Sequence, residues 1–259
     1  MRVFPGRVSA WVGEGRFFPA MGLLALLAAA WEAAVRGFAI PPYILPAPSR
    51  VARAILQEYP LLWRDAGVTL MEVGLGFLVA AAVGIALAFA IFHSPTLEKT
   101  LYPLIVASQT VPVFAIAPLL IVWFGYGLAP KVIMTALIVF FPIVVNTVDG
   151  LRAVDEDMVN LLRILRASPW TILWTVRVPG ALPFIFSGAK VGVAVSVIGA
   201  VIGEWVGSQE GLGYVMIHAN AQLRVDLIFA AILYLSVMAV GLFALVSAVE
   251  WLALPWRRA

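Results

Sequence analysis

Residues 150–179 read GLRAVDEDMVNLLRILRASPWTILWTVRVP and form a charged interval between two long apolar runs. The chain around it has 259 residues, is 63% hydrophobic and has a mean hydropathy of +1.02. Charged side chains are costly in the hydrocarbon of a bilayer. We therefore expect this interval to lie in water or against a partner. Its charged residues are Arg152, Asp155, Glu156, Asp157, Arg163, Arg166 and Arg177.

Outward from this interval, six apolar runs are each long enough to cross a bilayer. A helix rises about 1.5 Å per residue, so about 20 apolar residues cover the hydrocarbon core. The sequence therefore predicts an all-α integral membrane protein with about six transmembrane helices, and an even number places both termini on one side. The predicted spans are Phe17–Val35, Val68–Phe92, Leu104–Phe124, Lys131–Val148, Ala181–Val201 and Leu227–Trp251.

The basic residues predict the orientation of these spans. Lys and Arg near span ends favour the cytoplasmic side, and the larger set of them is cytoplasmic if the N-terminus is inside. We therefore expect residues 1–16 to form a cytoplasmic N-terminus, 17–259 a transmembrane domain and 150–179 a cytoplasmic loop within it. The first span follows three arginines, as a signal peptide would, but it lacks a small-residue cleavage pattern and is expected to be retained.

The composition argues against several classes of function. The formal charge of +3 and the pI near 9.4 fit a positive cytoplasmic face, and no basic arm suggests nucleic-acid binding. Cysteine is absent and His93 lies far from His218, so we expect no metal site. No nucleophile has an evident base, so we expect no catalytic residue. The P-loop pattern is also absent, so any ATP must act on another subunit.

Polar and ionisable residues inside the apolar runs are the next signals. Gln109 and Thr110 lie beside Pro112, where a broken helix could line a conduit or could simply be a structural kink satisfied by its own threonine. Glu72 and Lys190 have opposite charge at similar expected depth. We therefore predict a structural ion pair between the second and fifth spans.

Two connecting segments carry local signals. A short amphipathic helix is expected from Ser49 to about Glu58, with the Ser49 side chain as its N-terminal cap. Gly211 and Gly213 flank a leucine between apolar runs, which is typical of a tight turn or re-entrant loop.

The charged interval itself has the periodicity of two short amphipathic helices, broken near residues 167–169. Apolar residues recur at helical spacing from Met158 to Trp174, and Asp155 is a plausible N-terminal cap. Such a pair of helices can lie on the membrane surface or dock into a groove of a partner. The periodicity alone favours neither.

The interval also resembles the cytoplasmic signature of ABC importer permeases, of the branch that includes nitrate, sulfonate, taurine and pyrimidine-precursor permeases. That signature is E-A-A-x3-G-x9-I-x-L-P, and its spacing falls on Asn160, Leu161, Leu162, Arg166, Val176, Val178 and Pro179. The second half fits well, whereas the first half departs from it. Other similar segments are IPPYILPAPSRV from residue 40, WFGYGLAPK from 123, FPIVVNTVDGL from 141, RASPW from 166, VPGALP from 178, SGAK from 187, and Gly203-Glu204 followed by GLGY from 211.

This resemblance implies a type I importer permease in a bacterial plasma (inner) membrane. It implies two ATP-binding cassette subunits that bind ATP and magnesium, a second permease copy in a homodimer or heterodimer, and an extracytoplasmic solute-binding protein, with no cofactor on this chain itself. The loop is then the ATPase-coupling element, with residues Val159, Asn160, Leu161, Leu162, Leu165, Arg166, Ala167, Ser168 and Trp170. The implied candidates for the translocation path are Gln109, Thr110, Asn146, Ser196 and Glu204.

Two positions depart from the family pattern. Arg166 replaces the glycine of the turn, and because a Cβ disfavours left-handed backbone, the turn is expected to differ or to move by a residue. Glu72 stands where relatives often carry arginine. The alternative function is a stand-alone secondary transporter or channel, which would need inverted repeats or a relay of intramembrane ionisable groups. A membrane enzyme is a third class, without a catalytic constellation to support it.

Overall fold

A computed structural model describes residues 17–257, and the predicted cytoplasmic N-terminus over 1–16 lies outside this range. The described residues form helices joined by short connections, with no strand among them. The elements are α2 (Phe17–Gly37), α3 (Pro48–Gln57), α4 (Tyr59–His93), α5 (Pro95–Ser108), η1 (Val113–Ile116), α6 (Ala117–Phe124), α7 (Leu128–Arg152), α8 (Glu156–Ile164), α9 (Pro169–Ile172), η2 (Leu173–Arg177), α10 (Val178–Gly207), α11 (Leu212–Ala221), α12 (Val225–Ala253) and η3 (Pro255–Arg257).

The long helices agree with the predicted spans. Within the described range, four helical stretches are long and apolar enough to cross a membrane: α4, α7, α9 to α10, and α12. The bent pair formed by α5 and by η1 with α6 would be a fifth, and α2 occupies the first predicted span. The all-α membrane fold is therefore confirmed.

The predicted third span is broken rather than continuous. Its two halves, Pro95–Ser108 and Val113–Phe124, meet at an angle of 88°. Pro112 cannot donate a backbone hydrogen bond, and a proline disfavours helical backbone at the residue before it. Gln109 and Thr110 lie in the break and are exposed.

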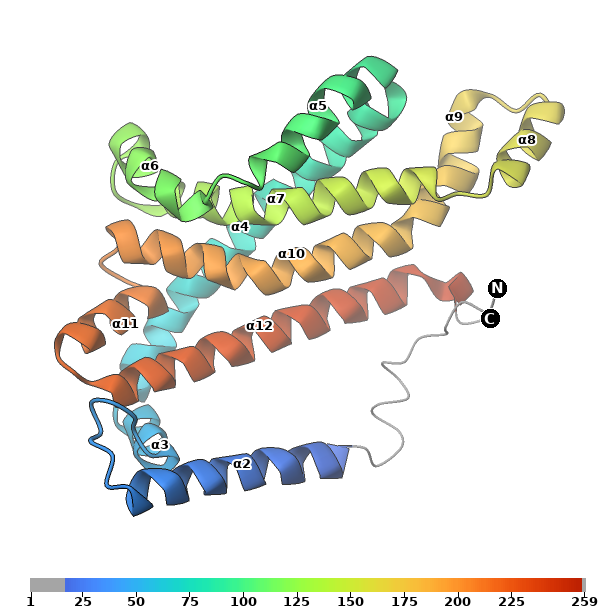
Figure 1. Cartoon of the computed structure of the whole chain (residues 1–259). Coiled ribbons are helices and arrows are strands. Elements are labelled where there is room, and N and C mark those ends of the chain that lie inside the picture. The colour runs from blue at the N-terminus through green and yellow to red at the C-terminus, as the bar shows by residue number, and fades with distance from the viewer. Residues whose placement is uncertain (1–16, 258–259) are drawn as a thin grey trace.

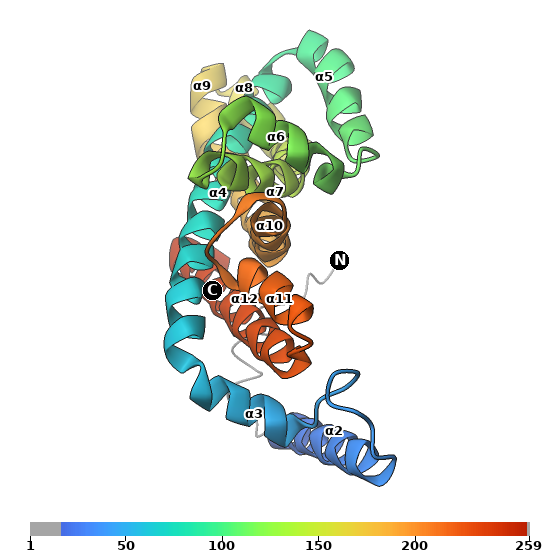
Figure 2. The same ribbon diagram turned by 90° about the vertical axis from the view of Figure 1, so that its left-hand side faces the viewer.

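The centre of the molecule is built from α4, α7 and α10. In Figure 1, α7 and α10 form a layer side by side and α4 crosses behind it. Figure 2 shows α7 and α10 nearly end on, with α4 running beside them. Small residues allow this close approach: a Cβ on Gly199 would lie 2.8 Å from the Thr135 Cα, and one on Gly76 would lie 2.5 Å from the Thr135 Cβ. Because lipid tails are as apolar as the helices, the hydrophobic effect does not drive helices together in a membrane, and close van der Waals packing of this kind stabilises their association.

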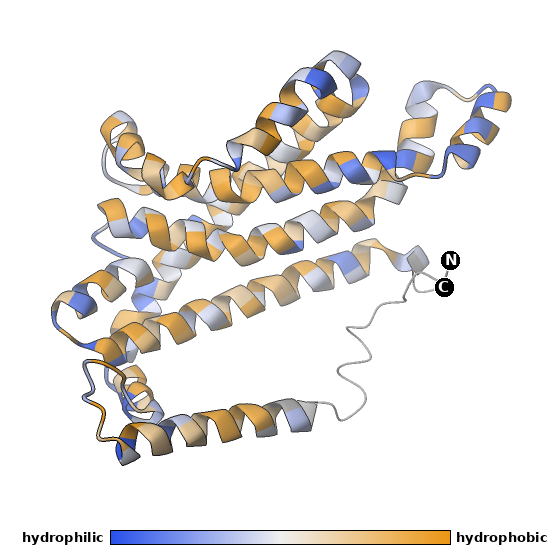
Figure 3. Cartoon of the chain, viewed as in Figure 1, coloured by the Kyte–Doolittle hydropathy of each residue, from blue (hydrophilic) through white to orange (hydrophobic). Residues whose placement is uncertain are grey.

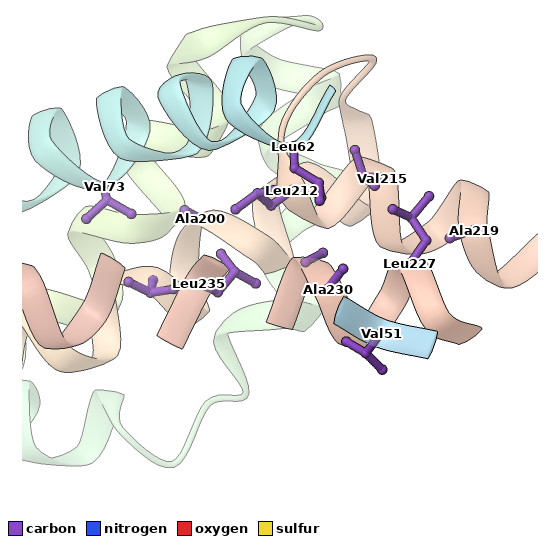
Figure 4. Packing of buried hydrophobic residues seen from close by; sticks show 12 residues of the cluster. Val51, Leu62, Val73, Ala200, Leu212, Val215, Ala219, Leu227, Ala230 and Leu235 are labelled. Atoms are coloured by element: carbon purple, nitrogen blue, oxygen red, sulfur yellow. The ribbon is translucent and has the colours of Figure 1, made fainter. Parts of the chain in front are cut away.

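A second packing centre joins α11 and α12 to this layer. Leu62 and Val73 of α4 pack with Ala200 of α10, Leu212 of α11 and Leu235 of α12 in one buried cluster (Figure 4). Burial of apolar side chains here fixes α11, which is too short to span a membrane. On the other side of α12, Trp31 of α2 lies against Phe229, with the ring centres 5.4 Å apart.

The two ends of the long helices differ in what they carry. Figure 1 shows α3, α6 and α11 at one end, which we call the α11 end, and α8 with α9 projecting at the opposite end. The long helices are largely apolar, and hydrophilic residues concentrate on the projection and around α11 (Figure 3). Such a distribution fits helices that cross a membrane with polar ends in water.

The prediction that the Ser49 side chain caps the short helix after the first span is wrong. α3 begins at Pro48, and no side chain caps it. The Ser49 hydroxyl instead donates to Oε1 of Glu32 over 2.7 Å, and the Ser49 backbone N–H donates to Oε2 of the same carboxylate over 2.9 Å. Ser49 therefore lies inside the first turn of α3 and ties it back to α2 through two charge-assisted hydrogen bonds to Glu32.

Candidate functional site

The projecting segment, Glu156–Arg177, is a helical hairpin that begins with the predicted cap. The Asp155 side chain accepts a hydrogen bond from the Asp157 N–H over 2.9 Å. This carboxylate satisfies an N–H at the start of α8, where the helix dipole favours an anion. We call Glu156–Arg177 the hairpin from here on.

The turn of the hairpin keeps the expected position, with an arginine in it. Arg166 adopts a left-handed φ of 59°. The Ala167 N–H donates to Leu162 O and the Arg166 N–H donates to Arg163 O, each over 2.9 Å. This pair of bonds closes a helix end that usually has glycine at the left-handed residue. The expectation that the turn would differ or shift is therefore wrong, because these bonds hold Arg166 in the conformation that a Cβ disfavours.

The hairpin presents apolar side chains to solvent. Leu161, Ile164 and Leu165 are 53%, 79% and 68% exposed on the outward face of α8. Val159, on the opposite face, is buried against the rest of the molecule. Of the other residues predicted for coupling, Leu162 and Ala167 are half-buried, whereas Asn160, Arg166, Ser168 and Trp170 are exposed. An exposed apolar patch on a segment that carries charge is typical of a protein contact.

At the opposite end, three side chains hold the start of α11. The Gly211 N–H donates to Oδ1 of Asp65 over 2.8 Å and the Leu212 N–H donates to Oγ1 of Thr69 over 2.9 Å. The Gly213 N–H donates to Oε2 of Glu204 over 2.5 Å. We call Asp65, Thr69 and Glu204 the α11 clamp.

The clamp is fully internal. Its three residues are at most 1% exposed. The Thr69 hydroxyl donates a hydrogen bond to Oε1 of Glu204 over 2.6 Å. The first N–H groups of a helix have no partner within the helix, and burial makes an unpaired N–H expensive. The clamp therefore lets α11 begin inside the protein, on side chains from α4 and α10.

The predicted ion pair between Glu72 and Lys190 is wrong. Nζ of Lys131 donates to Oε1 of Glu72 over 2.6 Å, and both side chains are buried. Lys190 instead pairs with Glu250 of α12. Lys131 was expected at a span end, but the start of α7 packs so closely on α4 and α10 that this ammonium lies inside, where it needs a carboxylate.

The candidate path residues divide into two groups. Gln109 and Thr110 are exposed, and half-buried Asn146 donates to Pro142 O over 2.8 Å. Ser196 and Glu204 are buried, and their hydrogen bonds are made inside the chain. Both side chains are covered in this structure, and Glu204 lies against Thr69 of α4 and the start of α11.

Asp65 and Thr69 are not among the residues predicted for the site. With Glu72 they stand at i, i+4 and i+7 of one long helix, so they share a face of it. Polar residues with that spacing in a mainly apolar helix are a signal for a buried polar contact. The described residues contain no group of three or more His, Cys, Asp or Glu that could hold a metal ion.

The comparisons with known proteins identify the family. Residues 80–254 match the model of the family described as "binding-protein-dependent transport system inner membrane component". The chain belongs to this family. It is accordingly a multi-pass inner-membrane protein and a permease component of a binding-protein-dependent ABC importer.

Relatives of this permease match along nearly its whole length. It is 42% identical to a probable ABC transporter permease protein of Haemophilus influenzae, covering 89% of this chain and 93% of that protein. It is 38% identical to the riboflavin transport system permease protein RibX of Chloroflexus aurantiacus, covering 93% of this chain and 91% of that protein. It is 36% identical to the formylaminopyrimidine transport permease protein ThiX of Halalkalibacterium halodurans, covering 90% of this chain and 93% of that protein.

A solved structure supports the fold of this permease. The MetNI methionine ABC transporter, in an inward-facing conformation, contains a chain that matches with a TM-score of 0.62 at 18% identity. The match covers 74% of this permease and 98% of that chain. The type I importer fold predicted from the sequence is therefore confirmed.

Proposed function

We propose that the hairpin is the element by which this permease is driven by ATP hydrolysis in a separate subunit. The observation that carries this proposal is the exposed apolar face of α8, formed by Leu161, Ile164 and Leu165. It lies on a segment that projects from the long helices and is flanked by charged residues (Figure 3). Such a surface fits an apolar groove with a polar rim on a partner.

The proposed assembly has two copies of the ATP-binding subunit, each bound by one permease hairpin, and two permease chains side by side. ATP and magnesium bind to those subunits, and this chain binds no cofactor. The hairpin end and both termini face the cytoplasm, and the α11 end faces an extracytoplasmic solute-binding protein. The excess of Lys and Arg at the predicted cytoplasmic span ends supports this orientation.

The proposed mechanism is alternating access, with no covalent chemistry in the permease. The path runs between two permease copies near the broken α5–α6 pair, where exposed Gln109 and Thr110 are the candidate lining residues. A bent span leaves backbone groups without helical partners, and such backbone is tolerated at membrane depth where it faces protein or water.

The proposed substrate class is a small nitrogen heterocycle. The riboflavin and formylaminopyrimidine relatives are 38% and 36% identical to this chain. The Escherichia coli taurine permease and the Synechocystis nitrate permease are 30% and 27% identical. This order favours a ring compound over a small anion. Uptake of riboflavin or formylaminopyrimidine, and not of taurine or nitrate, by the complete reconstituted importer is the expected result, and the reverse preference overturns this substrate class.

The docking proposal is tested by adding charge to the apolar face of α8. We expect Leu161→Asp with Leu165→Asp to abolish co-purification of the ATP-binding subunit and solute-stimulated ATP hydrolysis in proteoliposomes, because a buried unpaired carboxylate is costly. The matched control is Thr96→Asp with Ala153→Asp. It adds the same two charges at exposed positions of the same end, outside the hairpin.

Two outcomes would overturn this proposal. Unchanged association of the Leu161→Asp, Leu165→Asp variant would show that the apolar face contacts lipid or water rather than the ATP-binding subunit. Solute uptake by the permease alone, without any ATP-binding subunit, would favour the stand-alone transporter instead. Equal insertion of both variants in the membrane is the required check on folding.

A further inference from the structure

Arg177, the last residue of the hairpin, contacts the first residue of the hairpin and two other helices. Its Nη1 donates to the backbone carbonyl of Leu151, at the end of α7, over 3.0 Å. Its Nη2 donates to Oε1 of Glu156, the first residue of α8, over 3.1 Å. Its Cζ lies 5.0 Å from the centre of the Phe92 ring, in the last turn of α4. The Arg177 side chain is only 13% exposed, so its bond to the Leu151 carbonyl is shielded from competing water, whereas Glu156 is 60% exposed and its pair with Arg177 lies at the surface.

The backbone at Arg177 is itself unusual. Leu173–Arg177 form a π-helical turn between α9 and α10, in which the Val178 N–H donates to Leu173 O, five residues back. A π-turn holds an extra residue, and such turns are rare and frequent at functional sites. One extra residue rotates the helix before the turn by about 100° relative to the helix after it. This turn therefore sets the direction in which the hairpin leaves α10.

The base of the hairpin also has apolar packing that does not need Arg177. Leu151, Leu173 and Ala181 are buried together, with Phe89 and Phe92 packed against them. The ring of Phe89 stacks on Trp174, with the centres 6.5 Å apart. These contacts hold η2 in place. Val159 of α8 is buried and lines the same hollow as Phe92 and Leu173, and the start of α8 is tied to the end of η2 through the pair of Glu156 with Arg177.

We infer that Arg177 is a positioning residue that transmits movement of α8 to α4, α7 and α10. This inference rests on the proposed coupling role of the hairpin. A force on the exposed face of α8 reaches Glu156 at its first turn and passes through the guanidinium to Leu151 and Phe92. A planar guanidinium suits this task because it donates in several directions at once. The Leu151 carbonyl and the Glu156 carboxylate accept hydrogen bonds from separate nitrogens of the guanidinium, and the Phe92 ring lies against its face.

Arg163 provides a matched control on the same hairpin. It has the same charge and lines the same hollow at the base of the hairpin. Its Nη1, however, donates to Asn160 on its own helix over 3.1 Å, and the residue is exposed. Removing Arg163 therefore removes a hairpin arginine without breaking a link to another helix.

The test measures solute molecules transported per ATP hydrolysed in proteoliposomes of the complete importer. We expect Arg177→Gln to keep the ATP-binding subunit bound and to lower this ratio at least about tenfold, the equivalent of one lost charge-assisted hydrogen bond. Arg177→Lys keeps the charge near Glu156 but cannot donate in the same directions, so an intermediate ratio is expected. Arg163→Gln should retain the wild-type ratio.

The inference is overturned if Arg177→Gln transports with the wild-type ratio, or if Arg163→Gln loses as much as Arg177→Gln while the ATP-binding subunit stays bound. Should Arg177→Gln fail to assemble, Arg177→Lys decides alone: a wild-type ratio in it overturns the inference, and a reduced ratio with the subunit bound supports it. Failure of the docking proposal is seen separately, as unchanged association of the Leu161→Asp, Leu165→Asp variant.

Discussion

The α11 clamp and the hairpin treat polar and apolar groups in opposite ways. In the clamp, two carboxylates and a hydroxyl lie inside the protein, each bonded to a backbone N–H of α11 or of the residue that precedes it. On the hairpin, Leu161, Ile164 and Leu165 lie outside, more than half exposed. Burial of polar groups costs free energy unless each is hydrogen-bonded, and exposure of apolar groups costs free energy unless a partner covers them.

The α11 end has its clamp contacts within the chain, whereas the hairpin end leaves apolar side chains uncovered. The α11 end completes its hydrogen bonds within the chain, so α11 is held by α4 and α10 whether or not a partner is present. The hairpin end leaves Leu161, Ile164 and Leu165 uncovered within the chain, and we propose that a second protein covers them. Substitutions at the α11 end should therefore change the stability of the permease alone, whereas those on the hairpin should change assembly.

The largest expected effect is at the buried pair beside the clamp. Glu72→Met leaves the Lys131 ammonium buried without its carboxylate, and we expect a loss of about 3–5 kcal/mol in the free energy of unfolding. Thermal unfolding of the purified permease in detergent measures it. The double change Glu72→Met with Lys131→Met should recover most of the loss, since apolar side chains replace both charges. A double variant as unstable as the single one would contradict this account of the pair.

A smaller effect is expected within the clamp. Glu204→Gln keeps the size of the side chain but removes its charge and one acceptor oxygen. The Thr69 hydroxyl can then donate to the Asp65 carbonyl, 3.1 Å away, so the main loss is the charge of the carboxylate that accepts from the Gly213 N–H. We expect a cost of about 1.5–3 kcal/mol, the usual value of a hydrogen bond to a charged group. Hydrogen exchange at the start of α11 should also rise in this variant.

Ser196→Ala is the control for the clamp. Ser196 is buried on the same helix as Glu204, but its hydroxyl donates to Val193 O in that helix. Its removal should leave the exchange of α11 unchanged. Equal exchange in the Glu204→Gln variant and the wild type would show that the clamp does not hold α11.

The sequence predicted the spans well because they depend on length and hydropathy, which are local properties. It also predicted two helices in the interval after Gly150 and the cap by Asp155, because periodicity and capping act within a few residues. The break at Pro112 was predicted only as a kink. How far it bends depends on the residues that pack around it, and the sequence does not state that.

The long-range polar contacts could not be predicted from the sequence. Glu72 faces Lys131 rather than Lys190 because of how α4 and α7 rotate on each other, and that rotation is set by small residues such as Gly76 against Thr135. Glu204 could be recognised as an intramembrane acid, but not as the acceptor for an N–H nine residues later. Opposite charge and similar depth fix no pairing until the facing sides of the helices are known.

The smallest expected effect contrasts the two left-handed residues of these regions. Gly211 has a φ of 105°, and a Cβ there would collide with the Glu204 carboxylate, so Gly211→Ala should destabilise the permease. Arg166 has a φ of 59° and is exposed on the hairpin, so Arg166→Gly should relieve strain and raise the free energy of unfolding by about 1 kcal/mol. Thermal unfolding of both variants shows whether the first change lowers and the second raises the free energy of unfolding. If Arg166→Gly instead weakens binding of the ATP-binding subunit without changing stability, the arginine side chain itself contacts the partner, and the hairpin surface extends beyond the apolar face of α8.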